Sequence, residues 1–485
     1  MLTLKIVSKM KKILVGIVCF WTVISFSQSL SEKLTQFMQE LASDTNFTAA
    51  SIGLCVKEVS SGQVIFDYNA HKNFVPASLQ KLPLTAIALQ KYGSNYTFKT
   101  YLLVSGTIKD SVLKGDVYII GGGDPTLGCT RFKETFPDTI FAKWHKALVA
   151  NGIRTITGNL YIDPSFFDSH PLNDSWMWGD IGNYFGAGAR GLSWHENMFV
   201  ITMAPADSIN KKGIITDIYP LLPKDFIINN EVLTTKKETE SYLMVYGDSY
   251  GKQREISGNI ALNKATLSAK GALPFPEYVC AVSFEDYLVK QGVTIQGNIA
   301  YIDIDTLKNQ FDTIDVHQSP PLSTIVNHIH KTSNNIYAEA LLKLLGKGTS
   351  LGGLNELKIG LKRMGIPTEN IRLADGCGLS SANLISPYAL CDVLSYVYTT
   401  PFYNAYLLSL SEAGVSGTMK NILKNKPKGS NIYAKSGTMT GVRGYAGYAI
   451  NAKGTTYCFT VIVNNYTCNS SIVREKLERI LSLLM

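Results

Sequence analysis

The spacing of apolar and polar residues predicts alternating helices and strands at the start of the chain. Residues 29–43 carry apolar side chains at helical spacing, which predicts an amphipathic helix. Residues 49–57 and 63–68 have the pattern of two strands, and the turn residues Ser60-Ser61-Gly62 between them indicate a hairpin. The segment Pro76-Ala77-Ser78 then opens an apolar run that predicts a helix through about Gln90.

Residues 99–277 have a different sequence pattern, in which short β-like segments dominate. These segments are Tyr101–Ser105, Val117–Ile120, Asn159–Ile162, Glu240–Tyr246 and Glu255–Leu262. We therefore predict a β-rich insertion at 99–277 that holds one or two subdomains.

The pattern becomes helical again from residue 278, and strands return near the end of the chain. The predicted helices are 280–291, 323–332, 335–345, 353–364, 387–398, 403–411 and 470–484, and the predicted strands are 431–435, 443–450 and 457–464. Because the two ends resemble each other, we predict an α+β fold whose first domain consists of 28–98 and 278–485. The length of 485 residues leaves room for the insertion as further structure.

The first 27 residues have the pattern of a secretory signal peptide. Four lysines precede an apolar run at 13–26, and Ser25 and Ser27 provide small residues before a cleavage point at Gln28. The run is shorter than the roughly 20 apolar residues that span a bilayer, and an uncleaved anchor is the alternative. We expect an exported, periplasmic protein, either free or associated with the membrane or cell wall.

Charge and cysteine content exclude some classes of function. The formal net charge is +8, and removal of the four leader lysines lowers it to +4, without a dense basic run that would indicate nucleic-acid binding. Seven cysteines remain after the leader, without a Cys-x-x-Cys pair. The nearest histidines, His328 and His330, are two positions apart and would lie on different faces of a helix. We therefore predict neither a metal site nor a cofactor.

Two sequence patterns could provide a nucleophilic serine. Gly247-Asp248-Ser249-Tyr250-Gly251 fits Gly-x-Ser-x-Gly, but strand-like runs on both sides favour a hairpin turn over the strand–turn–helix arrangement that this motif needs. In Ser78-Leu79-Gln80-Lys81, by contrast, a helix start would place the serine and the lysine one turn apart on one face. A buried, neutral lysine can then accept the serine proton without a histidine.

Ser-x-x-Lys is common by chance, and two further elements give the Ser78 match its weight. Ser333-Asn334-Asn335 lies between two predicted helices and supplies Ser-x-Asn. Lys435-Ser436-Gly437 ends a predicted strand and is followed by Thr438, which would place a cation and two hydroxyl groups beside a cleft. The small Gly437 would allow a substrate backbone to approach closely.

In this order, the three elements resemble the motifs of penicillin-recognising serine enzymes. Longer strings resemble the D-alanyl-D-alanine carboxypeptidase/endopeptidase family of low-molecular-mass, class C penicillin-binding proteins. They are Pro76–Lys81, Gly121–Leu127, Asp375–Ser380 and Ala434–Arg443. The large separation of Ser78 and Ser333 also suits that family. The resemblance implies a serine β-lactamase/DD-peptidase-like transpeptidase domain, in which helices flank an antiparallel sheet, split by the insertion.

The resemblance also implies roles for individual residues. Ser78 would attack the bond between two D-alanines and Lys81 would accept its proton, while Ser333 and Lys435 would relay a proton to the departing amine. Asn335 would hold the substrate amide, and the backbone N–H groups of Ser78 and Thr438 would form the oxyanion hole. Ser436 and Thr438, beside Gly437, would bind the terminal carboxylate. The expected partners are peptidoglycan stem peptides and cross-links, and β-lactams would bind covalently.

Two residues depart from the family pattern, and one further residue is assigned to the substrate. Ser436 replaces the usual threonine but keeps the hydroxyl group, and Cys377 stands where the family often has serine. We assign Asp180, in a segment that resembles the substrate side of the family, to the free amino group of a stem-peptide diamino acid. A capping role for Asp180 is the alternative. A serine β-lactamase and a non-catalytic peptidoglycan-binding protein on the same scaffold remain the competing hypotheses.

Overall fold

The computed structural model describes residues 28–307, 310–424 and 431–485. The predicted leader at 1–27 lies outside these described residues. Within the described ranges, no helix has both the length and the apolar character needed to cross a membrane.

A six-stranded antiparallel sheet joins the two ends of the described chain. Its strand order is β16 (Ser411–Glu412), β17 (Ile432–Met439), β18 (Val442–Ile450), β19 (Thr456–Asn464), β1 (Ser51–Glu58) and β2 (Val64–Tyr68). The closure pairs β1 with β19, so that Ser51 lies opposite Asn464. The hairpin predicted at residues 60–62 and the three predicted late strands are confirmed. The α+β class predicted from the pattern is therefore correct.

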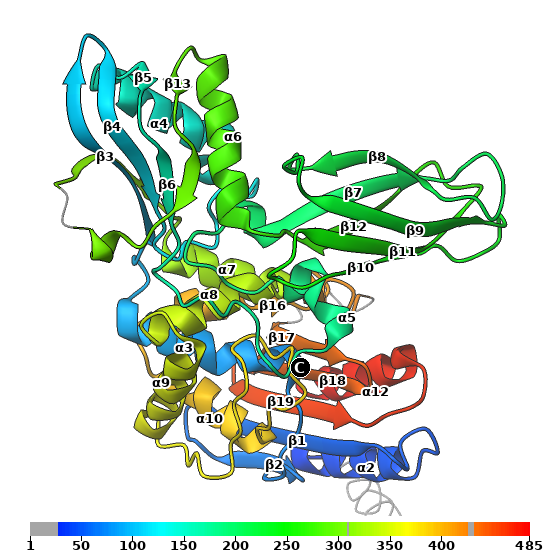
Figure 1. Ribbon diagram of the computed structural model, residues 1–485. Helices are drawn as coiled ribbons and strands as arrows, with labels where there is room; N and C mark the ends of the chain where they lie inside the picture. The colour runs from blue at the N-terminus through cyan, green and yellow to red at the C-terminus, as the bar shows by residue number, and fades with distance from the viewer. Residues whose placement is uncertain (1–27, 308–309, 425–430) are drawn as a thin grey trace, which may run out of the picture.

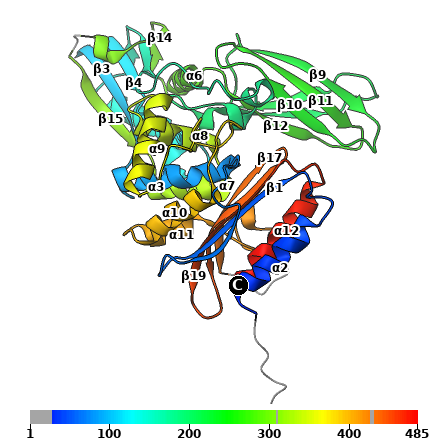
Figure 2. The same ribbon diagram turned by 90° about the horizontal axis from the view of Figure 1, so that it is seen from below.

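Helices cover both faces of this sheet. On one face, α2 (Leu30–Ala42) and α12 (Ser470–Leu483) pack side by side (Figure 2) and bury an apolar stripe that includes Leu34 and Leu477. The helix α2 begins at Ser29, whose side chain accepts from the Glu32 N–H in a capping box. The other face carries α3 (Lys81–Tyr92), α7 (Leu322–Thr332), α8 (Asn335–Leu345), α9 (Ser350–Arg363), α10 (Pro387–Tyr398) and α11 (Tyr403–Ser409).

The insertion contains a second sheet with its own core. Among the described residues this sheet has seven strands, namely β3 (Lys99–Lys109), β4 (Val112–Ile120), β5 (Thr155–Ile156), β6 (Leu160–Asp163), β13 (Thr294–Ile295), β14 (Ile299–Tyr301) and β15 (Asp312–Gln318). The helices α4 (Pro137–Ala150) and α6 (Pro276–Lys290) contribute Trp144 and Phe284 to this core. Figure 1 shows α6 beside this sheet, away from the six-stranded sheet.

Two three-stranded sheets also lie in the described part of the insertion and extend away from the seven-stranded sheet (Figure 1). One sheet contains β7 (Met198–Ala204), β8 (Ile214–Tyr219) and β12 (Leu267–Ala272), and the other contains β9 (Ile227–Thr235), β10 (Tyr242–Tyr246) and β11 (Gln253–Ala261). The antiparallel pair β10 and β11 is joined through Gly247–Gly251. The hairpin turn predicted for this Gly-x-Ser-x-Gly segment is therefore confirmed.

The packing does not follow the expected return to the first domain at residue 278. Val279, Cys280 and Phe284 of α6 are buried in the core of the insertion, and β15 pairs with β3. The periodicity identified a helix here but carried no information about which core it joins. We therefore propose that the insertion comprises residues 99–318 and that the first domain comprises 28–98 and 319–485.

Candidate active site

Ser78 lies in a tight helical turn immediately before α3. The turn η1 (Ala77–Gln80) is a 3₁₀ helix, in which side chains three positions apart eclipse one another. This geometry sets Ser78 above Lys81, the first residue of α3, with 2.9 Å between Ser78 Oγ and Lys81 Nζ. Ala77 has a φ of 47°, a left-handed conformation that alanine rarely adopts and that signals backbone strain beside the serine.

The Lys81 side chain is fully buried and its three donor positions are all used. Its Nζ donates to Ser78 Oγ at 2.9 Å, to Asn335 Oδ1 at 2.8 Å and to the Cys377 carbonyl at 2.5 Å. Burial lowers the pKa of Lys81, while the nearby Cys377, Asp375 and Glu339 act in the opposite direction. The three donations describe the ammonium form. A lowered pKa increases the fraction of the neutral amine, which has one proton fewer and can accept the Ser78 hydroxyl proton across the same 2.9 Å contact.

Two buried carboxyl groups lie behind Lys81. Glu339 Oε1 accepts from the backbone N–H groups of Gly376 at 2.9 Å and Cys377 at 2.7 Å. Burial, together with the charge of Asp375, raises the pKa of Glu339 to about 7. Asp375 accepts from the Gly378 and Ser380 N–H groups, both at 2.7 Å.

The same carboxyl groups form, with the thiol of Cys377, the one group of potential metal ligands found in the described part of the chain. Their hydrogen bonds to backbone N–H groups hold the loop at 375–380 against α8. Burial raises the pKa of the Cys377 thiol well above its usual value, so a reactive thiolate is disfavoured there. These contacts give the cluster a structural role, because they hold the loop whose Cys377 carbonyl accepts from Lys81.

The Ser-x-Asn element forms the sharp connection between α7 and α8. Ser333 caps α7 in the left-handed region with a φ of 60°, and Asn334 caps α8 by accepting from the Tyr337 N–H at 3.1 Å. The turn directs Ser333 toward Lys435, whereas Asn335 points its Oδ1 at Lys81. The Nδ2 of Asn335 donates to the Phe185 carbonyl of the insertion at 2.9 Å.

Lys435 lies on β17 and is also fully buried. Its Nζ donates to Ser333 Oγ at 3.0 Å and to the Ser436 carbonyl at 2.7 Å. Burial lowers the pKa of Lys435 well below its usual value, and the charge of Lys81 lowers it further. The neutral form of the Lys435 amine is therefore favoured beside a charged Lys81.

The strand β17 lies directly against the turn that carries Ser78. A methyl group added at Gly437 would lie 2.6 Å from the Pro76 carbonyl oxygen and 3.4 Å from Ala77 Cβ. Only a glycine allows this approach without a shift of the backbone. On either side of it, Ser436 is half-buried and Thr438 is exposed.

The structure brings together most of the residues singled out from the sequence. A continuous set of hydrogen bonds joins Ser78, Lys81 and Asn335, and a second contact joins Ser333 to Lys435. Asp180 lies apart from both sets, in the short helix α5 (Trp178–Ile181), where it is half-buried. Burial raises the pKa of its carboxyl group, which makes no hydrogen bond or ion pair with another described residue.

The segment that contains Asp180 is tied to the loop behind Lys81. Trp176 Nε1 donates to Asp375 Oδ2 at 2.9 Å, Ser175 Oγ lies 2.6 Å from Ser380 Oγ, and Asn173 Nδ2 donates to the Ala374 carbonyl at 2.5 Å. The insertion therefore helps to hold the 374–380 loop in place behind Lys81. Sequence reasoning did not identify Glu339, although an acidic residue within the apolar helical run at 336–345 was an available signal.

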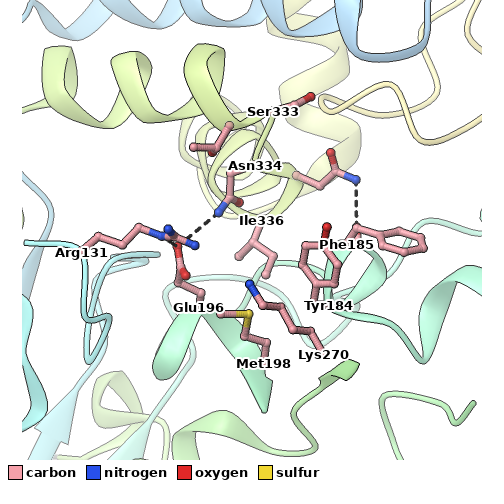
Figure 3. Close-up of a pocket in the computed structure, with 11 residues that line it drawn as sticks. Arg131, Tyr184, Phe185, Glu196, Met198, Lys270, Ser333, Asn334 and Ile336 are labelled. Carbon is pink, nitrogen blue, oxygen red and sulfur yellow. Dashed lines mark hydrogen bonds and ion pairs between the residues drawn. The ribbon is translucent and has the colours of Figure 1, made fainter. Parts of the chain in front are cut away.

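A pocket of about 220 Å³ opens beside the Ser-x-Asn turn (Figure 3). Residues 332–336 form one wall, and the insertion supplies the other with Arg131, Tyr184, Phe185, Glu196, Met198 and Lys270. Arg131 Nε donates to Glu196 Oε1 at 2.7 Å, and Asn334 Nδ2 donates to the same oxygen at 3.2 Å. Of these insertion residues, Tyr184 and Phe185 belong to the segment that resembles the substrate side of the family, and the others were not singled out from the sequence.

Comparison with known proteins gives consistent matches over most of the chain. The model of the D-Ala-D-Ala carboxypeptidase 3 (S13) family matches residues 34–483. A D-alanyl-D-alanine carboxypeptidase from Actinomadura sp. is 25% identical over 470 residues, which cover 92% of this chain and 85% of that protein. D-alanyl-D-alanine carboxypeptidase DacB from Haemophilus influenzae is 26% identical over 458 residues, which cover 91% of this chain and 92% of that protein.

The fold is also found among solved structures. The crystal structure of penicillin binding protein 4 (dacB) from Haemophilus influenzae superposes with a TM-score of 0.78 at 24% sequence identity. The match covers 93% of this chain and 98% of that chain, so it includes the insertion as well as the domain that carries Ser78.

Proposed function

The chain belongs to the D-Ala-D-Ala carboxypeptidase 3 (S13) family, and we propose that it acts as a serine DD-peptidase with Ser78 as its acylated nucleophile. It is a hydrolase that cleaves D-alanyl-D-alanine or D-alanyl cross-link bonds of peptidoglycan through an acyl-enzyme. The observation that carries the assignment of the nucleophile is the 2.9 Å contact between Ser78 Oγ and the buried Lys81 Nζ.

Acylation begins when Ser78 Oγ attacks the carbonyl carbon of the scissile bond. The neutral Lys81 Nζ takes the hydroxyl proton, and the carbonyl oxygen becomes an oxyanion that the backbone N–H groups of Ser78 and Thr438 bind. Such donors lower the barrier most when they are aimed at the charge that develops, and the loss of one typically costs about 10²–10³ in rate. The contact of β17 with the Ser78 turn at Gly437 supports this arrangement.

The tetrahedral intermediate then collapses with cleavage of its C–N bond. The departing amine takes a proton from Ser333, and Ser333 recovers one from Lys435, which lies 3.0 Å away. Lys435 in turn receives the proton that Lys81 took from Ser78, so that Lys81 is neutral again. Asn335 bonds the substrate amide, while Ser436 and Thr438 hold the terminal carboxylate with help from Lys435. Water finally attacks the ester at Ser78, with Lys81 as the base, and releases the shortened peptide.

β-Lactams offer the same site a strained amide, and we infer that they acylate Ser78 as substrate mimics. We also infer that the protein acts outside the cytoplasm, where peptidoglycan lies, which the signal-peptide pattern of residues 1–27 supports. Asp180 remains our candidate for the free amino group of a stem-peptide diamino acid. Its half-buried carboxyl group without a partner among the described residues supports that role.

The function is tested by the release of D-alanine from a stem peptide that ends in D-Ala-D-Ala. The wild-type protein should release it with turnover, and Ser78→Ala should release none above background. Benzylpenicillin distinguishes the alternatives, because a DD-peptidase accumulates a slowly hydrolysed adduct whereas a β-lactamase turns the drug over rapidly. A folded wild-type protein that performs neither reaction would contradict the proposal and favour a purely binding role.

A further inference from the structure

The insertion side of the pocket beside the Ser-x-Asn turn has no role in the mechanism given above. We propose that it is a subsite for the leaving strand, which binds the anionic peptide that departs when a peptidoglycan cross-link is cut. Lys270 and the outer face of Arg131 would hold a carboxylate of that strand. The proposal rests on the proposed function and deepens it, because it names the substrate that this site is built to accept.

The position of Ser333 connects the pocket to the reaction. Ser333 lines the pocket, and its hydroxyl group is also the proton donor to the departing amine. Whatever is attached to that amine therefore begins at Ser333 and continues away from Ser78. The pocket lies between residues 332–336 and the insertion, and Ser78 is not among the residues that line it.

A leaving D-alanine is too short to use this space. It ends at its own carboxylate, for which Ser436 and Thr438 on β17 are the proposed partners. The leaving strand of a cross-link, by contrast, continues beyond the amine as a second stem peptide that carries further carboxylates. Such a strand can extend past Ser333 toward Lys270, which lies on β12.

The charges in the pocket favour an anionic occupant. Figure 3 shows the Lys270 side chain directed from the insertion toward Ile336 and Asn334, with its ammonium group inside the pocket. Lys270 is exposed and has no carboxylate partner among the described residues, and its Nζ lies 5.6 Å from the centre of the Tyr184 ring. The pocket therefore carries a positive charge that no carboxylate among the described residues neutralises.

The other charged groups in the pocket balance one another. Glu196 is buried and pairs with Arg131, while the neighbouring His328 is neutral because burial, helped by Arg131, lowers its pKa to about 4. Because Arg131 and Glu196 neutralise each other, the remaining charge in the pocket is the +1 of Lys270. The Arg131 side chain uses only its Nε, which donates to Glu196, and its guanidinium makes no further hydrogen bond to a described residue, so its outer N–H groups remain available to a carboxylate.

The test compares two substrates of the full-length protein, a cross-linked muropeptide dimer whose stems both end in a single D-alanine and an uncross-linked pentapeptide. Lys270→Glu should lower the ratio of kcat/KM for the dimer to kcat/KM for the pentapeptide by about tenfold or more, as expected from the reversal of one charge in a binding site. Lys264→Glu makes the same charge change at an exposed position of the insertion and should leave both values unchanged. An unchanged ratio in Lys270→Glu would overturn the proposal.

A binding measurement separates this proposal from the proposed function. The dimer should bind Ser78→Ala about tenfold more tightly than it binds the double variant Ser78→Ala, Lys270→Glu, as measured by calorimetry. Equal binding by the two variants overturns the subsite even if the wild-type protein is active. A wild-type protein that cuts neither substrate overturns the DD-peptidase assignment, while the binding comparison still decides whether Lys270 contacts the strand.

Discussion

The Lys435 ammonium nitrogen lies 3.0 Å from the Ser333 hydroxyl oxygen, although the two residues are 102 positions apart. The left-handed turn after α7 presents the serine, and β17 presents the lysine. Both Lys435 and Lys81 are fully buried, and the charge of Lys81 depresses the pKa of Lys435. Because two buried cations repel each other, the two lysine amines are suited to share one added proton and to pass it through Ser333.

Removal of the Ser333 hydroxyl group should impair the proton transfer to the leaving amine. We expect Ser333→Ala to lower kcat/KM on a D-Ala-D-Ala peptide by about 10²–10⁴, the range typical of a lost acid–base group. The variant should fold normally, because alanine accepts the left-handed φ at a cost similar to serine. The control is Ser323→Ala on α7, whose side chain makes no hydrogen bond to a described residue. Full activity in Ser333→Ala would contradict the relay.

The pH dependence of acylation should follow the ionisation of Lys81. Because burial lowers the pKa of Lys81, the neutral amine is present below the ordinary lysine value of 10.5. The rate should therefore rise with pH as the amine loses its proton. The midpoint of this rise, the acid limb of the profile, should lie below that value. Measurement of kcat/KM across the pH range checks this. An acid limb at the ordinary lysine value would contradict the role of Lys81 as the base.

Glu339 should set the position of this acid limb. Its negative charge raises the pKa of Lys81, so Glu339→Gln should move the limb to lower pH. Glutamine keeps an oxygen that can accept from the Gly376 and Cys377 N–H groups, so the loop should stay in place. Glu369→Gln at an exposed position is the matched control. A limb that stays in place while kcat falls would indicate a purely structural role for Glu339.

Gly437 should tolerate no side chain. A methyl group there meets the Pro76 carbonyl at 2.6 Å, so Gly437→Ala must push β17 away from the Ser78 turn. We expect a loss of about 10² or more in kcat/KM, since it displaces an oxyanion donor, and a fall of about 1–3 kcal/mol in the free energy of unfolding. Gly213→Ala, whose added methyl group comes no nearer than 3.3 Å to another atom, is the control. Unchanged kinetics in Gly437→Ala would exclude this close contact in solution.

Asp180 should affect the choice of substrate and leave the chemistry intact. Asp180→Ala should weaken turnover of stem peptides that carry a diamino acid with a free amino group, through a higher KM, because the charge that binds the amine is lost. Turnover of a peptide in which that amine is acetylated should change little. Equal losses on both peptides would assign Asp180 a structural role in α5.

The sequence pointed to Ser78, Lys81, Ser333 and Asn335 through local geometry together with the order of the three motifs that resemble those of penicillin-recognising enzymes. A lysine three positions after a serine faces it in any tight helical turn, and a Ser-x-Asn between two helical runs has to form a turn. The support from Glu339 and Trp176 was not predicted, since it arises where α8, the 375–380 loop and the insertion meet. No local pattern specifies that meeting.

The limits of the insertion show the same distinction between local and long-range information. The helix α6 was predicted, but its place in the core of the insertion depends on contacts of Phe284 with Phe141 and Trp144 of α4. The helix α4 was missed because β-like segments surround it. Its buried residues Ile140, Phe141, Trp144 and Leu148 nevertheless follow a helical spacing that the sequence contains.

The measurement that tests the assignment of Ser78 most directly is mass spectrometry of the protein after incubation with benzylpenicillin. We predict one stable penicilloyl adduct that maps to Ser78 in the wild-type protein and is absent from a folded Ser78→Ala variant. An adduct on another residue, or an adduct that persists in Ser78→Ala, would contradict Ser78 as the nucleophile.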